Sequence, residues 1–143
     1  MSTKTFRGRL ADGGIETIRL STNDGLTGYR ILKFQVMPND PTDNNQESIS
    51  KIFTIEPSAA TDTVDFTDGT LVGVAYWKNA DIGNYSIDSV VIFDNVTFNQ
   101  DIYISTKGDN ASVSMNYHIE LEQVALNLNE ATVATLKDMR GRE

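Results

Sequence analysis

His118 is the only histidine in the chain, and it is the first candidate for acid–base or metal chemistry. A Ser-His-Asp site would also need a nucleophile, but the sequence has no Gly-x-Ser-x-Gly turn to present one. Side chains alternate between the two faces of a strand, so Asn116 and Glu120 are its expected neighbours. A strand histidine beside a carboxylate is typical of a surface pair between strands. We therefore predict no catalytic residue and no enzyme.

Carboxylates are numerous, and two that face each other across a cleft could hydrolyse a glycosidic bond. Most of the aspartates instead occupy turn positions, where the side chain bonds the local backbone. These residues are Asp12, Asp24, Asp40, Asp43, Asp62, Asp68, Asp81 and Asp109. We predict that they shape turns. A hydrolase with unrecognised acidic residues is the less favoured alternative.

The loop of residues 40–47 is rich in the hard oxygen ligands that calcium prefers. It contains Asp40, Asp43, Asn44, Asn45 and Glu47. Their spacing differs from that of an EF-hand loop. The absence of cysteine excludes disulfides, thiolate metal sites and cysteine nucleophiles. We predict no metal and no cofactor, and the sequence leaves calcium binding by this loop open.

The chain is acidic, with a net charge of −8 and a pI of about 4.5. Such a surface repels nucleic acid and anionic membranes, so neither is an expected direct partner. No stretch approaches the roughly 18 apolar residues of a membrane span, and no apolar signal region follows Met1. We expect a protein that folds in a cytoplasm. Without disulfides, oligomerisation is the obvious further source of stability.

Alternation of apolar and polar residues dominates the chain and predicts strands. It is clearest over residues 113–124, where Val113, Met115, Tyr117, Ile119 and Leu121 share one face. Other β-branched and aromatic runs are bounded by turn residues. They cover residues 5–10, 15–21, 29–37, 51–56, 71–78, 87–93 and 96–106. We expect the last two of these to pair around Asp94-Asn95, and the whole to form an antiparallel β-sandwich, jelly-roll-like, of about eight strands.

The end of the chain predicts one short helix over residues 129–140. Asn129, or Asn127 with Glu130 three residues later, can cap its first amides. Gly141 is a fitting stop, and Lys137 near the C-terminus complements the helix dipole. An isolated helix of about twelve residues is marginal in water. We therefore expect residues 1–128 to form the sandwich, with residues 129–143 packing on it or on a neighbouring subunit as helix and tail.

Three groups of residues are candidates for contact surfaces. Basic residues gather near both ends of the chain, and Tyr76-Trp77 places one ring on each face of its strand. The helix carries a narrow apolar stripe. We expect contacts through Lys4, Arg7, Arg9, Tyr76, Trp77, Val133, Leu136, Lys137, Met139 and Arg140.

Three segments near the C-terminus carry a resemblance to a known group. They are residues 91–105 (VIFDNVTFNQDIYIS), residues 115–124 (MNYHIELEQV) and residues 128–140 (LNEATVATLKDMR). Together they resemble small virion structural proteins of tailed phages, especially marine and cyanobacterial ones. The resemblance covers roughly the C-terminal third of the chain and brings no catalytic residues with it.

The resemblance implies a protein of the virion, assembled in the host cytoplasm and abundant in the particle. We expect a capsid decoration (cement) protein, with the major capsid protein or other virion proteins as partners and self-association as a trimer or ring as a further possibility. The first alternative is a ring component of the neck or tail. The alternative from another class is a carbohydrate- or receptor-binding β-sandwich module.

Overall fold

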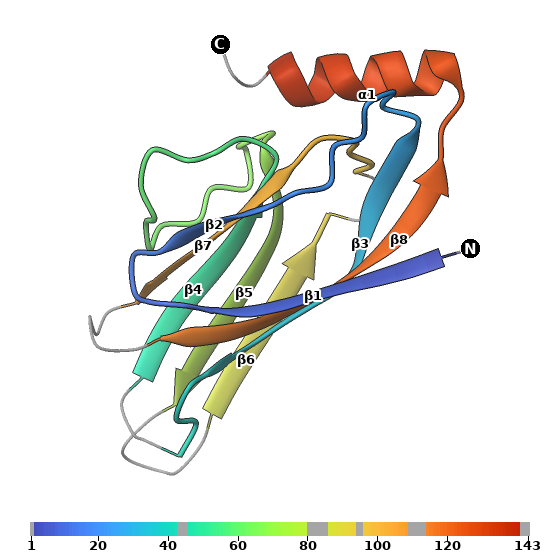
Figure 1. Cartoon of the computed structure of the whole chain (residues 1–143). Helices are drawn as coiled ribbons and strands as arrows, with labels where there is room; N and C mark the ends of the chain where they lie inside the picture. Colours follow the sequence, from blue (N-terminus) through green and yellow to red (C-terminus); the bar gives the residue numbers. More distant parts are fainter. Residues whose placement is uncertain (1, 43–45, 80–85, 94–95, 109–113, 141–143) are drawn as a thin grey trace.

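A computed structural model describes residues 2–42, 46–79, 86–93, 96–108 and 114–140. Within these ranges the chain forms eight strands and one helix (Figure 1). The strands are β1 (Ser2–Leu10), β2 (Ile15–Ile18), β3 (Thr27–Pro38), β4 (Gln46–Phe53), β5 (Leu71–Asn79), β6 (Ser86–Ile92), β7 (Ile102–Gly108) and β8 (Met115–Ala125). The helix is α1 (Leu128–Arg140). The predicted class, an antiparallel β-sandwich with one short C-terminal helix, is confirmed.

The strands form two antiparallel sheets, ordered β1-β8-β3 and β2-β7-β4-β5-β6. β1 pairs with β8, β2 with β7 and β4 with β5. The pairs are nested, as in a long hairpin whose two arms meet at the β4–β5 connection. A hairpin of this kind rolled into two layers is the jelly-roll arrangement. β6 pairs with β5 rather than β3, so both β3 and β6 are edge strands.

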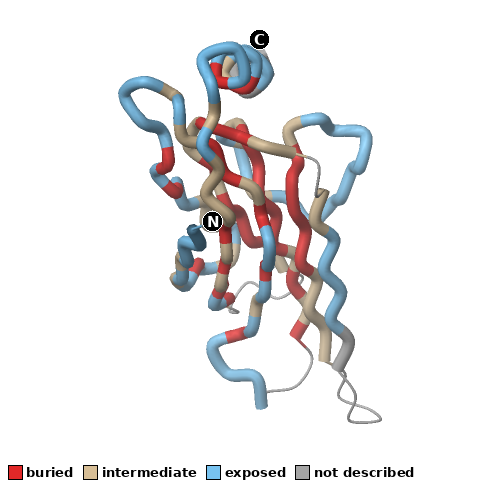
Figure 2. The backbone as a smooth tube through the Cα atoms, turned by 90° about the vertical axis from the view of Figure 1, so that its right-hand side faces the viewer, coloured by how far each residue is buried: buried red, intermediate tan, exposed pale blue. Residues whose placement is uncertain are grey.

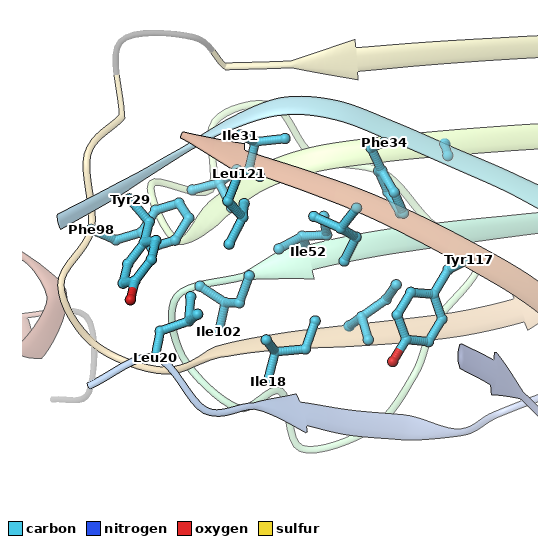
Figure 3. Close-up of a cluster of buried hydrophobic side chains, with 14 of the residues drawn as sticks. Ile18, Leu20, Tyr29, Ile31, Phe34, Ile52, Phe98, Ile102, Tyr117 and Leu121 are labelled. Carbon is cyan, nitrogen blue, oxygen red and sulfur yellow. The ribbon is translucent and has the colours of Figure 1, made fainter. Parts of the chain in front are cut away.

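The core lies between the two sheets and follows the alternation of the sequence. In β8 the side chains of Met115, Tyr117, Ile119 and Leu121 are buried, as predicted. Figure 3 shows Tyr117 and Leu121 beside buried residues of the other strands, and Figure 2 shows the buried segments concentrated in the middle of the sandwich. Burying a large apolar side chain contributes about 1.5–3 kcal/mol, so this face fixes the inward orientation of β8.

The predicted pairing of residues 87–93 with residues 96–106 is wrong. β6 pairs with β5, whereas β7 pairs with β2 and β4. Between β6 and β7, Phe98 instead forms a two-bond bridge with Tyr29, at N···O distances of 2.8 and 3.0 Å. The turn residues Asp94-Asn95 lie outside the described residues. A turn-like dipeptide can therefore predict a chain reversal, but it does not specify which strand pairs with the one before it.

Several predicted boundaries also move. β4 spans Gln46–Phe53, which shifts it towards the N-terminus of the predicted residues 51–56. β2 ends at Ile18, because the amides of Leu20 and Ser21 donate to the carboxylate of Asp101 at 2.7 and 2.9 Å instead of to a strand. Burial alone would raise the pKa of Asp101, but these backbone hydrogen bonds hold it below the usual range.

A buried lysine holds the long β4–β5 connection, residues 54–70, against the five-stranded sheet. The ammonium of Lys51 donates to the hydroxyl of Thr61 at 2.8 Å and to the carbonyl of Thr63 at 2.7 Å. Burial lowers the pKa of Lys51, and the negative charges of Asp62 and Asp68 oppose that shift. These two hydrogen bonds therefore hold the middle of the connection against the five-stranded sheet.

A glycine in β1 makes room for an aromatic ring of β8. Gly8 lies directly opposite Tyr117, and a Cβ at Gly8 would come within 2.7 Å of the tyrosine hydroxyl and 2.8 Å of ring atom Cζ. Burial, and then a hydrogen bond with Glu16 of β2, raise the pKa of Tyr117. The ring of β8 thus passes over the glycine and reaches the edge strand of the opposite sheet.

Replacing this glycine should destabilise the sandwich. We expect Gly8→Ala to lower the free energy of unfolding by about 1–3 kcal/mol, because the buried Tyr117 ring must move. Gly69→Ala is the matched control, since a Cβ at Gly69 meets nothing within 4 Å. Urea denaturation at an unchanged m-value measures both. Equal midpoints for the two variants would contradict the proposed packing.

Candidate functional site

The helix α1 begins with a reciprocal pair of hydrogen bonds. The amide of Glu130 donates to the Asn127 side-chain oxygen at 2.8 Å, and the amide of Asn127 donates to the Glu130 carboxylate at 3.3 Å. Of the two caps that the sequence allowed, the structure selects Asn127 with Glu130, which is a capping-box arrangement. Just before it, the amide of Leu126 donates to the carbonyl of Leu26 at 2.8 Å, which ties the entrance of the helix to the β2–β3 loop.

The side of the helix that faces the sandwich is made of small residues and held by one buried amide. Ala131 and Ala134 are only 4% and 8% exposed. Beneath them, the fully buried Asn99 donates from Nδ2 to the hydroxyl of Thr135 at 2.7 Å, to the carbonyl of Gly25 at 3.1 Å and to the carbonyl of Ala131 at 3.3 Å. A single side chain thus links the helix to the β2–β3 and β6–β7 connections.

The large apolar residues of the helix point the other way. Leu128 is 73% exposed, Val133 is 65% exposed and Leu136 is 55% exposed. At 3.6 residues per turn they fall within an arc of about 140°. Val133 and Leu136 lie away from the buried alanines, and Leu128 lies at the border, about 60° from Ala131. An amphipathic helix of a globular protein normally turns such residues towards the core. We call these three residues the helix face; Figure 1 shows α1 lying across the end of the sandwich.

The structure describes the side chains of some of the predicted helix contacts and not of others. Val133 and Leu136 belong to the exposed helix face, and Lys137 is exposed as well. The side chains of Met139 and Arg140 lie outside those that the structure describes. Leu128 was not predicted as a contact, because it precedes the expected first residue of the helix.

A second surface is a cleft of about 780 Å³ between the two sheets. It lies where β1, β3 and β5 end and where β6 and β8 begin, at the end of the sandwich away from α1 (Figure 1). We call it the end cleft. Its lining residues are Arg7, Gly8, Arg9, Gln35, Val36, Met37, Tyr76, Trp77, Asp88, Val90, Asn116, Tyr117 and His118.

Tyr76 and Trp77 occupy opposite faces of β5, as predicted. On the outer face, the hydroxyl of Tyr76 donates to Glu47, whose carboxylate lies 3.8 Å from the ammonium of Lys78. Trp77 lines the end cleft, and its buried indole N–H has no hydrogen-bond acceptor among the residues that the structure describes. A buried donor without a partner costs about 1–3 kcal/mol.

The basic residues near the N-terminus divide between two faces. Arg7 lies opposite His118 in the β1–β8 pair, and Arg9 lies opposite Asn116. All four border the end cleft, but they alternate with the inward-facing Gly8 and Tyr117 and so belong to the outer face of the three-stranded sheet. Lys4 has the opposite parity, and its ammonium lies 5.9 Å from the centre of the Tyr29 ring, within the range of a cation–π contact. Of the three predicted basic contacts, the structure brings only Arg7 and Arg9 together.

The acidic residues act mainly as turn residues, as predicted. Asp40 and Asp68 each accept two hydrogen bonds from a threonine two residues later, one from its amide and one from its hydroxyl. Asp65, which was not in the predicted set, does the same. Asp24 accepts from the amide of Leu26 at 3.0 Å. Residues 43, 81 and 109 of the predicted set lie outside the described residues.

Asp12 does more than shape its turn. Its carboxylate accepts from the amide of Gly108 at 2.6 Å and lies 3.2 Å from the ammonium of Lys107. It therefore joins the β1–β2 turn to the end of β7. Within the described residues there is no group of three or more His, Cys, Asp or Glu side chains placed to hold a metal ion. Residues 43–45 of the predicted calcium loop lie outside that part of the chain.

Asn99 and Lys51 were not identified from the sequence. Both are polar residues inside or beside apolar strand patterns, and such residues are usually exposed. Their roles depend on partners that are distant in sequence, such as Gly25 and Thr135 for Asn99. For Asn99, the only sequence signal was its position as a polar residue directly after the apolar Phe98.

Comparisons with known proteins leave the resemblance untested. No protein-family model matches the chain, and no curated protein sequence does. Among the residues described, no helix is both long and apolar enough to cross a membrane. The similarity to virion structural proteins of phages stays a prediction.

Removing the donors of Asn99 should release the helix. We expect Asn99→Asp to lower the free energy of unfolding by about 1–3 kcal/mol, because a carboxylate cannot donate and would face two carbonyl oxygens. Amide hydrogen exchange over residues 128–140 should also become faster. Asn116→Asp, at an exposed strand position, is the control and should change neither quantity. Unchanged exchange in Asn99→Asp would show that Asn99 does not hold the helix.

The Tyr76–Glu47 pair predicts a loss of stability at high pH. The hydrogen bond to Glu47, then burial and the charge of Glu47, raise the pKa of Tyr76 to about 12. The ordinary value is about 10, so between these values the unfolded chain loses a proton that the folded chain keeps, and stability falls as pH rises. The difference between the phenolate absorbance titrations of the parent and Tyr76→Phe isolates this group. In Glu47→Ala its pKa should return towards 10, and an unchanged pKa would contradict the pairing.

Proposed function

We propose that the chain is a structural protein of a phage virion, most simply a capsid decoration protein that stabilises the head through protein–protein contacts. The observation that carries the proposal is the orientation of α1. The helix packs on its own sandwich through Ala131 and Ala134 and leaves Leu128, Val133 and Leu136 in solvent. A helix with this arrangement is stable on the monomer and still presents three large apolar side chains to another protein.

The occupant of the helix face is an apolar groove on a coat subunit. Helix-in-groove recognition uses large apolar anchors at spacings of three, four and seven residues, and the helix face has anchors at spacings of three and five. Each contact is small, but a shell repeats it at every symmetric position, so the contacts can add up over the particle. The negative charge of the chain supports a partner that is protein rather than packaged DNA.

The first test is the number of copies per virion, measured by quantitative mass spectrometry of purified particles. A decoration protein should be present in stoichiometric proportion to the coat protein. A copy number below about twenty would contradict decoration, and six or twelve copies would favour a ring component of the neck or tail. Absence from the particle would contradict both structural roles.

The second test is directed at the helix face. We expect Val133→Ser together with Leu136→Ser to weaken cosedimentation with capsids at least tenfold, because losing about 1.4 kcal/mol of apolar contact already has that effect. Leu32→Ser is the matched control, since Leu32 is an exposed leucine of the sandwich, 42% exposed. Equal binding by the two variants would remove the helix face from the interface. Circular dichroism of each variant checks that the fold is retained.

A further inference from the structure

The two sheets end in four edge strands, which differ in how well the edge is protected. They are β1 and β3 in the three-stranded sheet and β2 and β6 in the five-stranded sheet (Figure 1). An edge strand is a template for pairing with another chain, and proteins normally protect it with lysines, prolines, bulges or short length. An edge without such protection is therefore a candidate contact surface.

Three of the four edge strands carry these protective features. β1 contains Lys4, Arg7 and Arg9. β3 has a shift in register after Ile31 and ends at Pro38, and β2 is only four residues long. β6, by contrast, has seven residues, pairs with β5 without a shift in register and contains no lysine, arginine or proline. β6 is thus the least protected edge in the part of the chain that the structure describes.

The outer edge of β6 presents the backbone groups of alternate residues. The amide of Phe93 donates to the carbonyl of Val72 at 3.2 Å, which continues the β5–β6 pairing by one position. Backbone groups of an antiparallel strand point alternately to one side and to the other, so the backbone of Val91 also faces β5. The N–H and C=O groups that point away from β5 belong to Asp88, Val90 and Ile92.

The side chains at this edge are apolar and exposed. Val90 is 41% exposed and Val91 is 36% exposed. Val90 lies opposite Ala75, on the inner face of the sheet, and Val91 lies on the outer face. A strand added beside β6 would therefore meet one valine on each face.

We propose that β6 pairs with β6 of a second copy, antiparallel and about a twofold axis, so that two five-stranded sheets join into one sheet of ten strands. A twofold axis perpendicular to a sheet brings the same strand of two copies together in the antiparallel direction, and both copies use the same surface. The second copy presents the same outward N–H and C=O groups at the same spacing. Each donor therefore meets an acceptor without any other surface of the chain taking part.

The charge of Asp88 selects the register of this pairing. An axis at Asp88 would place the two carboxylates directly opposite each other, and an axis at Ser89 would place them on the diagonal, about 7–8 Å apart. An axis at Val90 separates them by four residues along the strand, about 13 Å, which exceeds the Debye length of about 8 Å at physiological ionic strength. The Val90 axis also sets the two exposed valines against each other.

The contact is small. With the axis at Val90, the two Val90 residues exchange two hydrogen bonds, and two symmetric pairs of Asp88 with Ile92 bring the total to about six. Such a contact is well below the area of a standard stable interface, so the dimer should be weak and should form at about 100 µM and above. Each copy has a net charge of −8, so added salt should strengthen the dimer by screening the repulsion.

The parent protein gives the first test. Sedimentation equilibrium should show monomer and dimer and no larger species, because a twofold contact uses the edge of both copies. Amide hydrogen exchange at Val90 should slow as the protein concentration rises, whereas exchange at Val91, which already faces β5, should not change. A protein that stays monomeric at millimolar concentration, or that dimerises without protecting the Val90 amide, would overturn the proposal.

A charged residue on the axis should break the dimer. Val90→Lys places two ammonium groups directly opposite each other and should weaken dimerisation about tenfold. Val64→Lys is the matched control, since Val64 is also 41% exposed but lies in the β4–β5 connection. Asp88→Asn should have the opposite effect and strengthen the dimer, because the edge then carries no charge. Equal dimerisation by Val90→Lys and the parent would refute the pairing.

A single cysteine reports the register independently of any charged variant. The chain has no cysteine, so an introduced one can pair only with its own copy. Val90→Cys should form a disulfide-linked dimer on mild oxidation, since directly opposite residues lie about 5.5 Å apart between Cα atoms. Ser89→Cys, exposed on the same strand, should form far less, because its copy lies on the diagonal at about 7–8 Å. Equal cross-linking of the two would overturn the register.

Dimerisation is measured on the isolated protein and so does not depend on a virion role. Val133→Ser alters the helix face and should leave the dimer unchanged, because α1 belongs to neither sheet. A dimer lost in Val133→Ser, with the fold retained by circular dichroism, would contradict pairing through β6. Loss of the β6 contact would leave the helix-face proposal standing, and the reverse also holds.

Discussion

The register of β8 between β1 and β3 is the constraint on which the rest of the structure depends. Strand side chains repeat every two residues, so a slip of one residue would exchange the buried and exposed faces of the whole strand. In the observed register Tyr117 passes over Gly8 and its hydroxyl reaches Glu16, while Arg7 lies beside His118. One pairing therefore sets the core and the link between the sheets, and it places Arg7 and His118 together on the outer face.

The same strand also sets the position of the helix. β8 ends at Ala125, and two residues later Asn127 caps α1 over the end of the sandwich. The helix is then held by polar contacts from Asn99 and by close packing of alanines rather than by large apolar side chains. This gives up hydrophobic stabilisation of the monomer, because Leu128, Val133 and Leu136 remain in water. These exposed side chains are the surface on which the proposed contact with a second protein rests.

The sequence predicted features that depend on near neighbours. The alternation of β8, the capping by Asn127 and Glu130, and the turn role of Asp24, Asp40 and Asp68 each depend on residues within a few positions. The pairing expected for residues 87–93 and 96–106 failed because a turn motif specifies a reversal of the chain but not the strand that follows. Asn99 was missed for the same reason, since its partners Gly25 and Thr135 are distant along the chain.

By itself, the sequence determined the fold class, the position of the helix and the opposite orientations of Tyr76 and Trp77, because period-two and period-3.6 patterns are local consequences of backbone geometry. Only the tertiary structure decided which strands are neighbours and that Trp77 faces a cleft. It also decided that the helix turns its leucines and Val133 outward. These outcomes depend on which surfaces, far apart in the chain, are buried together in the core. A local sequence pattern does not specify that.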